Sequence, residues 1–134
     1  MVNKIFSKNG ELLHIHFASK AFEGDRIDIS PDEEYIQVSC LNLHDGKTFN
    51  AHKHLQNIRE ITITQESWVV IRGKVKAYYY DTDDELITTA ELSAGDCTIT
   101  FRGGHNYESM EDDTLVYEFK NGPYFGRAKD KELL

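Results

Sequence analysis

Three histidines and one glutamate are the side chains of this sequence best suited to bind a metal ion: His52, His54, Glu66 and His105. His52 and His54 are two residues apart, so on a β-strand they point to the same face. Glu66 begins a second run, ESWVVI, whose β-branched and aromatic residues favour a strand. If the two strands lie side by side, these three groups converge. His105 comes later in the chain and is the fourth candidate ligand.

Neutral imidazoles and one carboxylate suit a divalent transition metal. Iron, manganese, nickel, cobalt and zinc are all compatible with such ligands, so the expected cofactor is one ion whose identity stays open. Four protein ligands in an octahedral arrangement leave two adjacent positions, which water or a bidentate oxygen substrate can fill. The ligands alone do not select a reaction.

Short runs of alternating or β-branched residues occupy most of the chain and predict strands. We expect strands at residues 11–17, 35–43, 48–54, 58–64, 66–72, 74–80, 86–92, 97–101, 107–110 and 114–120. Turn-forming residues separate the runs, for example at residues 45–46, 94–96 and 121–123. Many short strands at this spacing predict an all-β sandwich or barrel. The length of 134 residues fits one domain spanning residues 1–134.

The spacing of these residues resembles that of the cupins, a family of small jelly-roll β-barrels. The first cupin motif is Gly, five residues, His-x-His, a short gap, Glu, six residues and Gly. Gly46, His52 and His54 match its first half, and Glu66 and Gly73 match its second half. Eleven residues separate His54 from Glu66, where the family pattern has three or four. The resemblance implies an all-β fold, a cupin-type jelly-roll β-barrel, with the metal bound by these side chains.

The second cupin motif begins with Gly-Asp and reaches a His after a turn. The stretch GDCTITFRGGH supplies Gly95 and His105 in that order. The proline usual in the turn is missing, but the glycines at 103–104 can make the reversal because glycine accepts positive φ. The resemblance covers roughly residues 35–120 and implies that His105 completes the metal site. If Glu66 lies outside the coordination sphere, a three-histidine site remains and zinc is favoured.

The elements HKH and FRGGH and the C-terminal segment around NGPY are similar to small cupins found alongside surface-polysaccharide and nucleotide-sugar genes. This similarity implies a polar, sugar-like ligand near the metal. The residues implied are Glu118 as a catalytic base and Arg59, Trp68, Lys120 and Tyr124 as substrate-binding residues. The alternative is an ion-paired rim with a packed aromatic, and a core role for Trp68.

Three functions are compatible with these residues. The preferred one is a metal-binding cupin acting on a small oxygen-rich molecule, as a sugar or nucleotide-sugar isomerase or epimerase, with Glu118 moving the proton. An iron-dependent dioxygenase would use the same ligands to activate oxygen. A non-enzymatic binding or accessory protein of a polysaccharide pathway would use the barrel as a receptor. The sequence does not rank the enzymatic and binding classes.

Charge and composition limit the partners. The 15 basic and 23 acidic residues give a net charge of -8, and there is no basic block, so we expect no nucleic-acid partner. No apolar run approaches the length of about 20 residues that spans a bilayer, and the N-terminal residues lack the pattern of a signal peptide. We therefore expect a cytoplasmic protein that does not attach to membranes, with Cys40 and Cys97 as free thiols. The strand after Glu66 is apolar on both faces, which predicts that a second sheet or a second subunit covers it and favours a homodimer.

Overall fold

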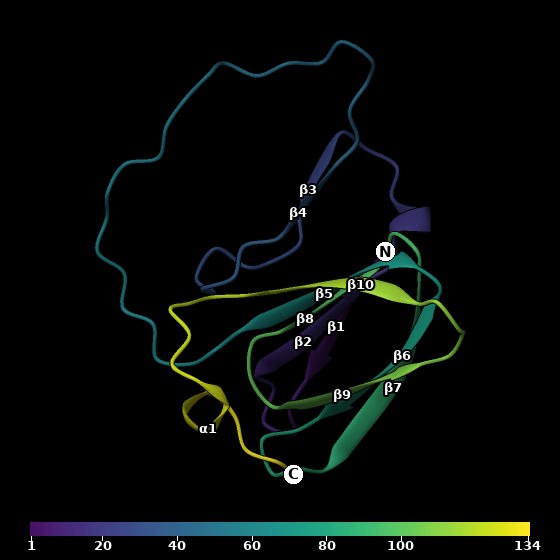
Figure 1. The fold of residues 1–134 in the computed structure, drawn as a ribbon, viewed down its shortest axis with the longest axis vertical. Helices are drawn as coiled ribbons and strands as arrows, with labels where there is room; N and C mark the ends of the chain where they lie inside the picture. The colour runs from purple at the N-terminus through teal and green to yellow at the C-terminus, as the bar shows by residue number, and fades with distance from the viewer.

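Antiparallel β-sheets dominate the structure, a computed structural model that describes all residues 1–134 (Figure 1). The strands are β1 (Val2–Phe6), β2 (Leu12–Phe17), β3 (Arg26–Asp28), β4 (Ser39–Leu41), β5 (Glu66–Arg72), β6 (Lys74–Tyr80), β7 (Leu86–Ser93), β8 (Cys97–Thr100), β9 (Gly104–Ser109) and β10 (Leu115–Lys120). Two short helices are η1 (Ser19–Ala21) and α1 (Arg127–Asp130). Neither helix has the length and apolar composition needed to cross a bilayer. The predicted all-β class is confirmed.

The strands form three sheets, and none of them closes into a barrel. The largest sheet has the order β1-β2-β8-β5-β10, a second has the order β7-β6-β9, and β3 pairs with β4. Figure 1 shows the three-stranded sheet on one side of the five-stranded sheet and the β3–β4 pair on the other side. The five-stranded sheet therefore has a covering layer on each face.

Two apolar clusters fill the space on the two sides of the five-stranded sheet. One joins Val70 of β5 to residues of β1, β6 and β7. The other is built on β2, β8 and Ile29, the residue that follows β3, and Val69 packs against it. Because Val69 and Val70 are adjacent, their side chains point to opposite faces. The prediction that this strand is covered on both faces is confirmed, and segments of the same chain do the covering.

The glycines and the aspartate of the predicted motifs have clear structural roles. Gly73 joins β5 to β6 with a φ of 82°, and a side chain there would collide with Thr114. Only glycine adopts this left-handed conformation without strain. Asp96, which is 7% exposed, accepts hydrogen bonds from the backbone N–H groups of Ser19 and Ser93, both at 2.9 Å. These contacts fix the turn between β7 and β8.

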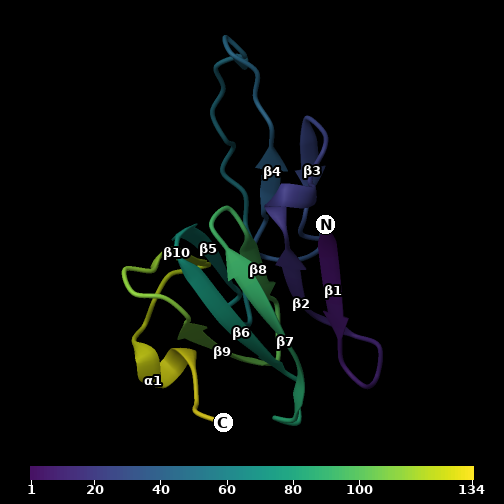
Figure 2. The same ribbon diagram turned by 90° about the vertical axis from the view of Figure 1, so that its right-hand side faces the viewer.

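The predicted strands at residues 48–54 and 58–64 are wrong, because residues 42–65 form an irregular loop. Figure 2 shows this loop extending away from the sheets beyond β3 and β4. Both runs alternate as a strand does, but residues 48–64 make no backbone–backbone hydrogen bond with any other segment. A strand exists only where a neighbour completes its hydrogen bonds. The predicted strand at 35–43 is likewise reduced to β4.

A hydrogen-bonded network anchors the start of the segment that precedes β4. Glu34 receives two hydrogen bonds from the Arg102 guanidinium, at 2.9 and 3.1 Å. Gln65, which is fully buried, donates from its side-chain nitrogen to Glu34 at 2.6 Å and accepts from the backbone N–H of Ile36 at 2.9 Å. The network ties the chain on both sides of the 42–65 loop to the end of β8.

Replacing Glu34 with alanine should lower the free energy of unfolding by about 1–3 kcal/mol, because Arg102 and Gln65 would lose charge-assisted partners in a partly buried site. Urea unfolding followed by circular dichroism measures this loss. The matched control is Asp83→Ala, which removes an exposed ion pair with Lys8 and should have little effect. Equal losses in the two variants would contradict the structural role of the network.

His14 lies in the core of the five-stranded sheet and is neutral. The side chain is fully buried, its Nε2 donates to the carbonyl oxygen of Tyr80 at 3.0 Å, and its Nδ1 lies 3.0 Å from the hydroxyl of Thr100. Burial lowers the pKa of His14 from 6.5 to about 4, although the Tyr80 carbonyl acts in the opposite direction. The predicted strand at residues 11–17 is confirmed as β2, and His14 is one of its core residues.

The buried His14 should make the fold less stable in mild acid. Between pH 6.5 and 4 the unfolded chain binds a proton at this residue and the folded chain does not, so stability is complete above pH 6.5 and falls as the pH is lowered. We expect His14 to account for a loss of about 2–3 kcal/mol between pH 7.5 and 4.5. Urea unfolding of wild type, His14→Gln and the exposed control His44→Gln isolates this share, because burial lowers the pKa of His16 as well. His14→Gln should show the smallest dependence on pH, and an unchanged dependence would contradict the assignment.

Candidate functional site

The register between β5 and β10 gathers four polar and aromatic side chains on the face of the five-stranded sheet that looks toward the three-stranded sheet. Lys120 lies opposite Glu66, and Glu118 lies opposite Trp68. Side chains two residues apart on a strand share a face, so all four point the same way. Alternation along β5 places Trp68 on the face of Glu66, and alternation along β10 places Glu118 and Lys120 on one face.

Strand β9 adds two rings from the opposite sheet. The Nε2 atom of His105 lies 3.2 Å from Oε1 of Glu66. The ring of Tyr107 stacks on the indole of Trp68, with centroids 4.1 Å apart and an angle of 26° between the planes. We call the set the inner-face cluster; it consists of Glu66, Trp68, His105, Tyr107, Glu118 and Lys120.

Glu66 is held in its charged form. The residue is only 7% exposed, and burial by itself raises the pKa of its carboxyl group. The hydrogen bond and charge of His105 and the positive charges of Lys120 and Lys131 outweigh burial and leave the pKa below its ordinary value of 4.5. The ammonium group of Lys120 lies 4.0 Å from Glu66 Oε2. A carboxylate therefore persists between the sheets at neutral pH.

Glu118 lies at the more exposed side of the inner-face cluster. Its Oε2 accepts a hydrogen bond from the indole nitrogen of Trp68 at 3.2 Å, and its Oε1 lies 2.9 Å from the Lys120 ammonium. The side chain of Glu118 is 39% exposed, so a ligand can reach it from solvent. The Lys120 ammonium also lies 5.3 Å from the ring centre of Tyr124. A base, a cation and aromatic rings thus adjoin one another.

One buried polar atom of the inner-face cluster, Nδ1 of His105, has no hydrogen-bond partner. The buried hydroxyl of Tyr107 lies near the hydroxyl groups of Thr98 and Thr100. Burial raises the pKa of the Tyr107 hydroxyl well above its ordinary value, so it stays protonated. An unpartnered buried polar group costs about 1–3 kcal/mol, and such groups are uncommon in native structures. A bound polar ligand would supply the partner that His105 Nδ1 lacks.

The remaining predicted residues lie apart from the inner-face cluster. His52, His54 and Arg59 are all exposed in the 42–65 loop. The rings of His52 and His54 lie 5.5 Å apart, so the pair stays together, and His52 Nδ1 contacts the carbonyl of Asn50 at 2.9 Å. The structure brings Glu66 and His105 together and leaves the two other predicted metal ligands in the loop.

The fit of the inner-face cluster to a metal ion is therefore incomplete in this arrangement. Glu66 and His105 are of the right chemical type, and the free Nδ1 of His105 shows that its ring has bonding capacity to spare. However, no group of three or more His, Cys, Asp or Glu side chains gathers to hold a metal anywhere in the chain. Two donors supply half of the expected ligand set.

Tyr107 is the functional candidate that sequence reasoning missed. The sequence predicts a strand that begins at this residue but assigns the side chain no role. Because Tyr107 lies two residues after His105 on β9, alternation places both rings on the same face. That signal is present in the sequence, and only the pairing with Trp68 requires the structure.

Comparison with protein-family models, with curated proteins and with solved structures found no match to this chain.

Replacing Lys120 with methionine should raise the pKa of Glu66, because the carboxylate would lose a nearby positive charge. The carboxyl 13C chemical shift of Glu66, followed by NMR as the pH is lowered, reports this pKa. Lys74→Met is the control, since Lys74 lies at the start of β6 beside Glu111. A Glu66 pKa that does not respond to the loss of Lys120 would show that the two charges are screened from each other.

Proposed function

We propose that the protein is a metal-binding cupin that acts on a small oxygen-rich molecule, with isomerisation or epimerisation of a sugar or nucleotide sugar as its reaction. The observation that carries the proposal is the inner-face cluster, in which a carboxylate, an imidazole, a base, a cation and an aromatic stack adjoin one another. Glu66 and His105 lie 3.2 Å apart, and Glu118 lies 2.9 Å from Lys120. Such a set of polar groups beside flat apolar rings suits a ligand that has hydroxyl groups on an apolar ring.

The finer fold that belongs to this proposal is the cupin-type jelly-roll barrel. Two antiparallel sheets already face each other across Trp68 and Tyr107. Residues 48–54 have the alternation of a strand and unused backbone hydrogen-bonding groups. Pairing of this run with a sheet edge would add a strand and carry His52 and His54 toward the interior.

In the proposed site His52, His54, Glu66 and His105 hold one divalent transition metal. A bound metal of this kind polarises a carbonyl or hydroxyl oxygen. The donor types of these four side chains support this assignment. It requires the 42–65 loop to bring His52 and His54 to Glu66 and His105. A three-histidine site without Glu66 is the variant of the same proposal that favours zinc.

Glu118 is the proposed base. It takes a proton from the carbon next to a carbonyl and returns it to the neighbouring carbon or to the other face of the same carbon. The indole N–H of Trp68 and the ammonium of Lys120 hold this carboxylate in place. In isomerisation the hydroxyl proton of the substrate passes through water to the former carbonyl oxygen, so that the oxygen and carbon protons balance over the reaction, whereas epimerisation leaves the oxygen protons in place. The aromatic rings position the sugar, and Tyr124 lies beside Lys120 at the rim. Arg59 would join them only when the 42–65 loop pairs with a sheet edge.

Metal content tests the metal assignment without reference to activity. Purified wild-type protein should contain about one transition-metal ion per chain by elemental analysis, and His52→Ala and His105→Ala should lose most of it because each removes a ligand. His44→Ala is the matched control, because His44 is an exposed histidine of the same loop. Equal metal content in wild type and His52→Ala would contradict the proposal.

Isomerisation of keto-sugars and nucleotide sugars, assayed with and without a chelator, tests the reaction. Glu118→Gln should retain the metal and lower kcat by about 10²–10⁴-fold, as expected for loss of a general base. Ligand binding without turnover in the wild type would instead favour the binding or accessory function. Oxygen uptake that appears only with ferrous iron would favour the dioxygenase.

A further inference from the structure

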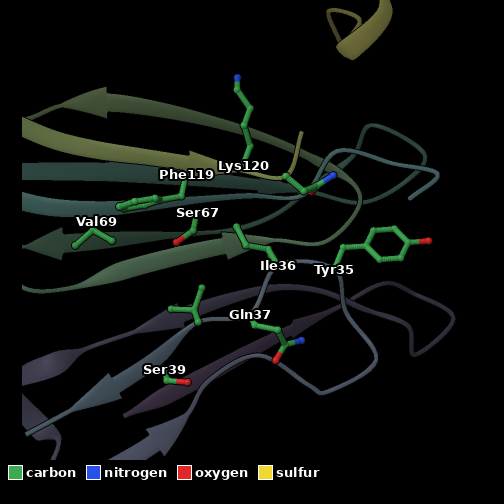
Figure 3. Close-up of a pocket in the computed structure, with 10 residues that line it drawn as sticks. Tyr35, Ile36, Gln37, Ser39, Ser67, Val69, Phe119 and Lys120 are labelled. Carbon is green, nitrogen blue, oxygen red and sulfur yellow. The ribbon is translucent and has the colours of Figure 1, made fainter. Parts of the chain in front are cut away.

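A hollow lies on the opposite face of the five-stranded sheet from the inner-face cluster. Its volume is about 420 Å³, within the range of small-molecule sites. β5 and β10 form its floor, and the segment leading into β4 forms its roof (Figure 3). We call it the outer groove; its lining residues are Tyr35, Ile36, Gln37, Val38, Ser39, Ser67, Val69, Phe119, Lys120 and Asn121.

The outer groove contains one polar group that has no partner. Ser67 is 1% exposed, and its hydroxyl makes no hydrogen bond. Figure 3 shows this hydroxyl pointing from β5 into the space below it, toward the segment that contains Ile36 and Gln37. Leaving a buried hydroxyl unpaired is unfavourable, whereas alanine at the same position would carry no such penalty. An occupant with a single hydrogen-bonding oxygen would pair with it.

The other polar side chains of the outer groove are already engaged. Gln37 donates to the backbone carbonyls of Pro31 and Glu34, and Asn121 bonds the backbone of Gln65. The Lys120 amine points away from the groove in Figure 3 and pairs with Glu118 on the other face. No free charge therefore faces the occupant, which argues for an uncharged molecule.

The outer groove is preformed. The network of Arg102, Glu34 and Gln65 anchors one end of its roof, and the backbone N–H of Val38 donates to the hydroxyl of Ser30 at 3.1 Å at the other end. A roof fixed at both ends loses little entropy when a ligand binds. Phe119, opposite Ser67 across the strand pair, is 54% exposed. Its ring lines the groove together with Ser67.

From these observations we infer that the outer groove is a binding site for an uncharged, largely apolar small molecule that carries one carbonyl or hydroxyl oxygen. The apolar part lies between Val69, Phe119 and the roof residues Ile36 and Val38. The oxygen pairs with the hydroxyl of Ser67. The site is separate from the inner-face cluster, since adjacent residues of β5 point to opposite faces.

Binding of the naphthalene ketone 6-propionyl-2-(dimethylamino)naphthalene tests this inference. The probe is uncharged, carries one carbonyl oxygen and emits at shorter wavelength when it leaves water. We expect saturable binding of one probe per chain. Ser67→Ala should weaken it by about threefold to tenfold, as the loss of one hydrogen bond does. Val69→Phe should abolish binding by filling the groove.

Three controls establish that the probe occupies the outer groove and pairs with Ser67. The same naphthalene amine without the ketone should bind wild type and Ser67→Ala equally, because it has no oxygen for Ser67. Ile71→Ala changes an exposed residue on the same face of β5 that does not line the groove, and it should leave probe binding unchanged. Circular dichroism and thermal unfolding should show that Ser67→Ala folds normally, since it removes an unpaired hydroxyl.

Several results would overturn the inference. They are the absence of saturable binding, an affinity that neither Ser67→Ala nor Val69→Phe alters, and equal sensitivity of both probes to Ser67→Ala. Loss of probe binding as the protein concentration rises, together with dimers in sedimentation, would show that a second copy of the chain covers the groove. None of these readouts depends on metal content or isomerase activity, so this inference and the proposed function fail independently.

Discussion

The alternation of side chains along β5 is the constraint on which the rest of the structure depends. The strand pairs with β8 and β10 along its two edges, and a separate layer of the chain covers each of its faces, so each face must match its own layer chemically. Glu66, Trp68 and Val70 face the three-stranded sheet, while Ser67 and Val69 face the layer that contains β4. A slip of one residue in the pairing with β8 or β10 would place a charge in the apolar cluster of the second layer. The two apolar clusters and the inner-face cluster therefore allow only one register for β5.

A carboxylate between two sheets requires compensation, and the arrangement around Glu66 supplies it from three directions. The cross-strand neighbour on β10 provides a positive charge, β9 provides an imidazole, and the C-terminal segment provides a second cation at longer range. Breaking such a set leaves a charge unpaired in a partly dry space. Stability and chemical reactivity are thus linked here, since the groups that make the carboxylate tolerable are also the ones that would act on a ligand.

Much of the sheet framework could be predicted from local sequence, because β5 and β6 carry dense β-branched and aromatic runs with a glycine between them. β1 and β3 could not be predicted because they are short and contain Lys, Asn or Asp, so pairing with β2 and β4 decides their structure more than propensity does. Alternation indicates which side chains share a face of β5 or β10, but the pairing of Lys120 with Glu66 requires the register that the structure shows. The relation of His52 and His54 to Glu66 could not be predicted, because spacing within a run does not identify the strand that pairs with it.

The lack of backbone–backbone hydrogen bonds between residues 48–64 and the rest of the chain also affects how this protein can change over evolutionary time. The entropic cost of closing a loop grows only with the logarithm of its length, about 0.6 kcal/mol for each doubling. Insertions and deletions between the ends of the loop therefore hardly disturb the sheets, whereas they change the reach of the histidines. The number of residues between His54 and Glu66 is therefore not set by the packing of the sheets. The framework and the histidine-bearing segment can consequently diverge under separate selection.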